Sequence, residues 1–284
     1  MVESENKKEN RLFWRRLGGA FLLFFCMQGV ASAAELIKDD IDFRKDVYVD
    51  KGGARLPYRL FVPLGYDADR KYPLLLWLHG VDGRGSDNVK QLTHENQLST
   101  HFWISSQAQA KFPAFLLVPQ CPSGEPWAEP EFNQPSKWLL LTMQVLAKVQ
   151  KEFSIDPDRV YVGGQSMGGL GVWSLLQMYR GQWAGAIVMS AYDTFSDIPA
   201  IAEVPLWVFQ GDADQSVPVD TVRAMMSQLR KKHANLRYTE YHKIDHKVWN
   251  KAFAEPNLLP WLSAQKRHSP ADNPPSSDTT IPSH

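Results

Sequence analysis

The sequence feature that most constrains the fold is a series of short apolar runs that alternate with longer, helix-like stretches. Continuous apolar runs of this length are typical of strands that are buried on both faces of a parallel sheet. The alternation predicts a single-domain α/β fold, in which helices cover both faces of a mostly parallel central sheet. The runs are Leu74–Leu78, Pro113–Val118, Val160–Val162, Ala186–Met189 and Leu206–Phe209, and the helix-like stretches are Ser136–Phe153, Met167–Met178 and Val219–Lys231.

The two ends of the chain differ from its centre. Lysines and arginines precede the apolar run Leu17–Val30, and the small residues of Ala31-Ser32-Ala33 follow it, which is the pattern of an export signal. We expect residues 1–33 to be a signal peptide and the protein to be periplasmic or extracellular, with an uncleaved N-terminal anchor as the alternative. Residues 34–55 then form a lead-in with the first strand, residues 56–264 the main domain, and residues 265–284 a disordered tail rich in Pro and Ser.

Within the N-terminal part of the domain, Val47–Asp50 and Leu56–Val62 flank a Lys51-Gly52-Gly53 turn and predict a hairpin. Between Ser190 and Pro205 the chain has room for a short loop and not for a large helical cap. Because sheets of this kind place their sites at the carboxyl edge, the predicted edge would be open to bulky ligands.

Charge and cysteine content exclude several classes of partner. Lys plus Arg and Asp plus Glu both total 31, so the formal net charge is zero and we expect no nucleic-acid partner. Cys26 lies in the predicted signal, which leaves Cys121 without an internal disulfide partner, and we expect it to be a buried packing residue. Because the spacing of His and Cys residues fits no metal site, we expect neither a metal nor a cofactor.

The motif Gly164-Gln165-Ser166-Met167-Gly168 lies between the predicted strand Val160–Val162 and a helix. A G-x-S-x-G sequence in this context predicts a sharp, strained turn that exposes the serine hydroxyl at the sheet edge. Gly164 and Gly168 must lack side chains so that strand and helix can approach. Ser166 is therefore the candidate nucleophile, and a simple helix-capping role is the alternative.

A serine nucleophile needs a base and an acid, which in this motif follow in the order acid, then histidine. Asp212 and Asp214 both follow the strand Leu206–Phe209. His242 and His246 both follow the strand-like stretch Leu236–Tyr241. We favour Asp214 because Asp212 lies nearer the strand end, where it would brace the turn. We favour His246 because His242 lies closer to the strand-like stretch.

Attack on a carbonyl also requires donors for the oxyanion. The glycine-rich turn after Leu74–Leu78 begins His79-Gly80-Val81 and can aim a backbone amide at the nucleophile. We assign the oxyanion hole to the backbone amides of Val81 and Met167, the second of which begins a helix whose dipole favours an anion. His79 is expected to orient this loop by hydrogen bonding. Trp127 and Trp249 are possible substrate-lining residues, with core packing as the alternative.

These blocks together resemble the α/β-hydrolase superfamily, near phospholipase/carboxylesterase and dienelactone-hydrolase-like serine esterases, secreted polyhydroxybutyrate-depolymerase-type enzymes and the "predicted peptidase" branch. The resemblance covers about residues 56 to 263 and rests on blocks that occur in order. They are Leu78-His79-Gly80, Arg84-Gly85-Ser86-Asp87-Asn88, Val118-Pro119-Gln120-Cys121-Pro122 with Trp127, Gly164–Gly169, Gly211–Pro218, and His246 with Trp249. It implies Asp214 as the acid and His246 as the base. Asp82 departs from the pattern, because relatives usually carry a small residue, then Gly and an acid in this turn.

The expected activity is hydrolysis of small-molecule or polymeric carboxylic esters by two-step acyl transfer. A serine peptidase or amidase that uses the same residues is one alternative. A non-catalytic binding protein on the same fold is another, and it predicts that a member of the Ser-Asp-His set is missing.

Overall fold

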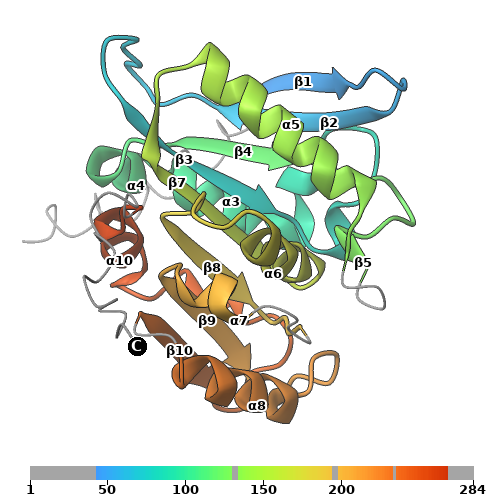
Figure 1. Ribbon diagram of the computed structural model, residues 1–284, viewed down its shortest axis with the longest axis vertical. Coiled ribbons are helices and arrows are strands. Elements are labelled where there is room, and N and C mark those ends of the chain that lie inside the picture. The colour runs from blue at the N-terminus through green and yellow to red at the C-terminus, as the bar shows by residue number, and fades with distance from the viewer. Residues whose placement is uncertain (1–42, 130–133, 194–197, 233–234, 268–284) are drawn as a thin grey trace, which may run out of the picture. The chain divides into compact units, whose positions relative to one another are not determined.

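The computed structural model describes residues 43–129, 134–193, 198–232 and 235–267. The predicted signal peptide and most of the predicted tail lie outside these residues. The domain is built around an eight-stranded sheet with the strand order β1-β2-β4-β3-β7-β8-β9-β10 (Figure 1). Its strands are β1 (Phe43–Val49), β2 (Arg55–Phe61), β3 (Tyr72–Leu78), β4 (Phe115–Pro119), β7 (Ile155–Gln165), β8 (Gly185–Met189), β9 (Leu206–Gly211) and β10 (Leu236–Tyr241).

The sheet is mostly parallel, as the apolar runs predict. The hairpin β1–β2 is antiparallel, with Val49 opposite Arg55, and β2 pairs antiparallel with β4. All other neighbours from β4 to β10 run parallel. A separate two-stranded ribbon joins β5 (Ala128–Glu129) and β6 (Gln134–Pro135). The predicted fold class and hairpin are confirmed.

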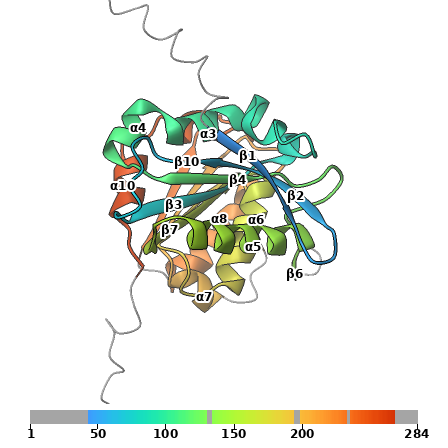
Figure 2. The ribbon, with the colours of Figure 1, turned by 90° about the horizontal axis from the view of Figure 1, so that it is seen from above.

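Helices cover both faces of the sheet, which Figure 2 shows edge-on. One face carries α5 (Lys137–Glu152), α6 (Met167–Met178), α7 (Ile198–Ala202) and α8 (Val219–Arg230). The other carries α3 (Gln97–Ile104), α4 (Ser106–Lys111), α9 (Trp249–Ala252) and α10 (Leu258–Ala264). The segment between β8 and β9, predicted as a short loop, contains the five-residue helix α7. None of the helices in the described ranges is long and apolar enough to cross a membrane.

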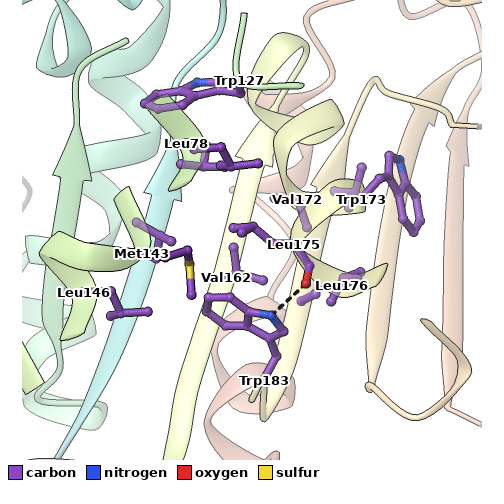
Figure 3. Close-up of a cluster of buried hydrophobic side chains, with 14 of the residues drawn as sticks. Leu78, Trp127, Met143, Leu146, Val162, Val172, Trp173, Leu175, Leu176 and Trp183 are labelled. Atoms are coloured by element: carbon purple, nitrogen blue, oxygen red, sulfur yellow. Dashed lines mark hydrogen bonds between the residues drawn. The ribbon is translucent and has the colours of Figure 1, made fainter. Parts of the chain in front are cut away.

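Two hydrophobic cores follow from this layering. Alternate residues of each strand point to opposite faces, so Leu76 belongs to the core under α5 and α6 and its neighbour Trp77 to the core under α3 and α10. In the first core, Trp183 fills the space beside α6 and donates its indole N–H to the Leu175 carbonyl at 3.3 Å (Figure 3). These cores hold β7 and α6 rigidly on either side of Ser166.

The register brings distant segments together at one edge. Leu78 at the end of β3 pairs with Gly164 near the end of β7. At the other side of the sheet, Gly211 at the end of β9 pairs with Tyr241 at the end of β10. The loops that follow these four strands therefore share the carboxyl edge, where open α/β sheets place their sites.

Candidate active site

Ser166 occupies the turn between β7 and α6 in a backbone conformation that side chains rarely allow. Its φ is 53° and its ψ is −122°, and its N–H donates to the Met189 carbonyl on β8 at 2.8 Å. A Cβ on Gly168 would lie 2.0 Å from the Leu78 carbonyl oxygen, and one on Gly164 would lie 2.6 Å from the Gly168 backbone. The prediction that both glycines must lack side chains is confirmed.

The structure brings Ser166, Asp214 and His246 together in one hydrogen-bonded chain. His246 Nε2 lies 2.8 Å from Ser166 Oγ, and His246 Nδ1 lies 2.8 Å from Asp214 Oδ2. The carboxylate accepts the Nδ1 proton, so the Nε2 lone pair faces the serine hydroxyl. This is the tautomer that can take a proton from Ser166.

Asp214 is held as a buried acceptor. Its side chain has 0% exposure. Oδ1 accepts from the backbone N–H groups of Ser216 at 2.8 Å and Val217 at 2.9 Å, and Oδ2 accepts from Gln210 Nε2 at 3.0 Å as well as from His246. These donors satisfy both carboxylate oxygens and fix the direction in which the carboxylate faces the imidazole.

The backbone of His246 is anchored from a third strand. Ser190, which follows β8 and is fully buried, donates its hydroxyl to the His246 carbonyl at 2.7 Å. Ser190 has a φ of 49°, a strained value for a non-glycine residue. Trp249 packs edge-on against the His246 ring, with 5.7 Å between ring centroids, and is 4% exposed. Ser190 therefore fixes the backbone of His246, and Trp249 packs against its ring.

The predicted oxyanion donors flank the nucleophile. Met167 is the first residue of α6, and Val81 is the first residue of the 3₁₀ helix η2 (Val81–Gly83), where N–H groups have no acceptor within their own helix. The preceding Gly80 lies against the nucleophile, since a Cβ built on it would be 3.7 Å from Ser166 Cβ. Asp82 is exposed on this turn.

His79 is buried next to that loop and ties it to the segment that follows β4. Its Nδ1 lies 2.6 Å from the Gly80 carbonyl, and its Nε2 accepts the backbone N–H of Cys121 at 3.0 Å. Burial lowers the pKa of His79 to about 4, so the ring is neutral at pH 7 with its proton on Nδ1. Trp127, which is fully buried, donates its indole N–H to the His79 carbonyl at 3.1 Å. Both side chains thus support the backbone that leads to Val81.

Several known proteins similar to this chain are esterases. The family described as "Putative esterase" matches residues 52–261, well over half of the chain. The chain belongs to this esterase family. Among solved structures, a thermostable esterase is 33% identical to it with a TM-score of 0.76, over 80% of this chain and 64% of that one, slightly less than two thirds of its length.

Proteins less similar to this chain are also named as esterases. A ferulic acid esterase from Anaeromyces mucronatus, 17% identical with a TM-score of 0.58 over 78% of this chain and 90% of that one, shares the fold. A bifunctional acetylxylan esterase/xylanase of Neocallimastix patriciarum is 26% identical over 159 residues, 56% of this chain but only 22% of that protein. A probable carboxylesterase of Arabidopsis thaliana is 23% identical over 216 residues, 69% of this chain and 79% of that one. The chain therefore has the α/β-hydrolase fold and is a member of an esterase family with carboxylesterase-like relatives.

Gln120 and Asn96 support the oxyanion loop, the glycine-rich segment that begins His79-Gly80-Val81. Neither was predicted as a site residue from the sequence. Gln120 donates from Nε2 to the Gly83 carbonyl at 3.1 Å and accepts the Asn88 N–H at 2.6 Å. Asn96 accepts the Gly80 N–H at 3.1 Å. Gln120 lies in a block that the resemblance quotes, but Asn96 lies in a stretch without apolar periodicity, and nothing in the sequence links it to Gly80.

The esterase carries a second Asp–His pair beside the first. His242 Nδ1 lies 2.7 Å from Asp212 Oδ2, and Asp212 Oδ1 accepts the Lys243 N–H at 2.6 Å. The His242 side chain is 78% exposed, so this pair faces solvent and does not reach Ser166. The described part of the chain contains no group of three or more His, Cys, Asp or Glu side chains that could hold a metal ion. Cys121 is buried, as predicted.

Proposed function

We propose that this esterase is a secreted serine hydrolase that cleaves carboxylic esters through an acyl-enzyme intermediate, with Ser166 as nucleophile, His246 as general base and Asp214 as orienting acid. The single observation that supports this most strongly is the unbroken chain from Asp214 through His246 to Ser166, with both contacts at 2.8 Å. The family and the carboxylesterase-like relatives support ester hydrolysis itself.

In the first half of the reaction, Ser166 Oγ bonds to the ester carbonyl carbon while His246 Nε2 takes the hydroxyl proton. The carbonyl oxygen becomes an oxyanion that accepts hydrogen bonds from the Val81 and Met167 N–H groups. The bond to the alcohol oxygen then breaks, and His246 gives its proton to the leaving alcohol. In the second half, water repeats these steps, so the acid is released and Ser166 is restored.

The substrate class follows from what surrounds the site. The segment between β8 and β9 is short and holds the five-residue helix α7, which supports access for bulky or polymeric esters. One relative is named as an acetylxylan esterase and a solved neighbour as a ferulic acid esterase, names that refer to esters of polysaccharides or aromatic acids. We assign residues 1–33 to export and residues 56–264 to catalysis on the sequence pattern.

The test compares a short and a medium p-nitrophenyl ester with a matched p-nitroanilide. We expect the purified protein to hydrolyse the esters, and Ser166→Ala to lose at least about 10³-fold of that activity while its circular dichroism spectrum is unchanged. Faster hydrolysis of the anilide would instead assign the site to an amidase. Equal rates for wild type and Ser166→Ala would exclude Ser166 as the nucleophile.

A further inference from the structure

A guanidinium group lies beside the nucleophile's turn, and the proposed reaction does not use it. Arg84 ends the 3₁₀ helix η2, and its backbone N–H donates to the Val81 carbonyl at 3.2 Å. Its side chain is half-buried and turns toward α6, where Nε lies 3.1 Å from Met167 Sδ. Arg84 therefore contacts Met167, the residue that follows Ser166. The backbone N–H of Met167 is one of the two predicted oxyanion donors.

Arg84 has no counter-ion within the described ranges of the chain. No carboxylate there lies within ion-pair distance of its guanidinium, and the two terminal nitrogens make no hydrogen bond to a described residue. Two other arginines of the domain form ion pairs: Arg223 binds Glu240 at 2.6 Å, and Arg267 binds Asp158 at 3.0 Å. Arg59, which is buried, donates to the Asn88 carbonyl at 2.7 Å instead. A half-buried cation without a partner is unusual, because partial desolvation costs free energy that an anion would offset.

A second cation near the site is already neutralised. Lys247, next to His246, forms an ion pair with Glu95 at 2.6 Å. Asp82 is close in sequence to Arg84, but its side chain is exposed to solvent, where water and salt screen its charge. Arg84 is therefore a half-buried cation beside the nucleophile's turn that no described carboxylate neutralises.

We propose that Arg84 binds a carboxylate carried by the ester substrate, so that the enzyme selects esters with a negative charge near the scissile bond. The geometry points to this ligand because Nε faces Met167, which leaves the two terminal nitrogens side by side as donors. That pair matches the two oxygens of a carboxylate, a fit that lysine cannot reproduce. The inference rests on the proposed ester hydrolysis and adds its substrate class.

The carboxylate can belong to the acyl group or to the alcohol, and two matched substrate pairs distinguish these sources. The acyl pair is mono-p-nitrophenyl succinate and its neutral methyl ester. The alcohol pair is 4-acetoxybenzoate and 4-acetoxybenzamide. The readout is the ratio of kcat/KM for the charged and the neutral member, after subtraction of spontaneous hydrolysis.

We expect wild type to favour the charged member of at least one pair by about 10- to 100-fold, the range that one charge-assisted contact supports. Arg84→Gln brings that ratio to about one, and Arg84→Lys retains part of it. Arg70→Gln is the matched control, because Arg70 is exposed just before the start of β3, at the edge of the sheet opposite the site, and should leave the ratio unchanged.

An equal ratio for wild type and Arg84→Gln in both pairs would overturn the inference. If both members of a pair also lose the same factor in kcat/KM, Arg84 acts as a brace of the loop that begins His79-Gly80-Val81. If no ester is hydrolysed, the proposed function fails by itself, and calorimetric binding of 4-acetoxybenzoate to Ser166→Ala with and without Arg84→Gln still decides the role of Arg84.

Discussion

The two Asp–His pairs at the ends of β9 and β10 contain the same residue types in two different environments. Asp212 and His242 follow directly after the strands, whereas Asp214 and His246 lie further along the same loops. The Asp214 side chain has no exposed surface and the Asp212 side chain is 22% exposed, while His246 is 25% exposed and His242 78%. Residue type alone therefore does not distinguish a catalytic pair from a surface pair.

What distinguishes them is the set of neighbours that surround each one. Asp214 accepts hydrogen bonds from Gln210, Ser216 and Val217 in addition to His246. Asp212 binds the Lys243 N–H, and Ala213 donates to the Ile244 carbonyl, so this pair fastens the two loops to each other. A tight contact helps, since a Cβ on Gly211 would lie 2.2 Å from the Ile244 carbonyl oxygen. The contacts between Asp212 and His242 thus hold together the two loops that carry Asp214 and His246.

Removing each histidine should separate the two pairs most strongly. We expect His246→Gln to lose at least about 10⁴-fold in kcat for a p-nitrophenyl ester, because the serine hydroxyl loses its base. His242→Gln should remain within about threefold of wild type, because its ring does not reach Ser166. Steady-state kinetics on variants whose fold is checked by circular dichroism measures both, and a comparable loss in the two variants would contradict the assignment.

Replacing the acids should give a slightly smaller contrast. Asp214→Asn is expected to lose about 10³- to 10⁴-fold in kcat, because an amide can donate to Nδ1 and favour the wrong tautomer of His246. Asp212→Asn keeps an oxygen for the Lys243 N–H and should lose no more than about threefold. The same kinetic assay tests both, and a large loss in Asp212→Asn alone would transfer the acid role to it.

A third histidine, His79, should affect the free energy of unfolding rather than the catalytic rate. The pKa of His79 falls from 6.5 to about 4 on folding because the ring is buried. Between about pH 6.5 and pH 4 the unfolded chain therefore binds a proton on His79 that the folded protein does not bind. The free energy of unfolding keeps the contribution of neutral His79 at pH 7 and loses it as the pH falls toward 4. The loss amounts to about 2 to 3 kcal/mol at pH 4.5, an order-of-magnitude value.

Urea unfolding at a series of pH values tests this expectation. His79→Asn, which keeps a donor for the Gly80 carbonyl, should show a shallower fall in the free energy of unfolding between pH 7 and 4.5 than wild type. His242→Gln should follow the wild-type curve in this range. Parallel curves for wild type and His79→Asn would show that folding does not change the pKa of His79 and would contradict this expectation.

The sheet and the three central residues could be predicted from the sequence, and much of their support could not. Apolar runs such as β3 and β8 are unambiguous because they are buried on both faces. Helix α3 was missed because polar Ser99 and Thr100 are buried within it, and α10 because it contains Pro260. Ser190 could not be foreseen, since its hydroxyl binds a carbonyl 56 residues away and only the folded chain brings the two together.

We propose that buried Asp214 and His246 make Ser166 the reactive nucleophile. The most direct measurement is stoichiometric labelling with an organophosphate such as paraoxon, followed by mass spectrometry of the intact protein and its peptides. We predict one phosphoryl group per chain, located on Ser166, absent in Ser166→Ala and formed far more slowly in His246→Gln than in His242→Gln. A label on another residue, or equal labelling of wild type and Ser166→Ala, would contradict it.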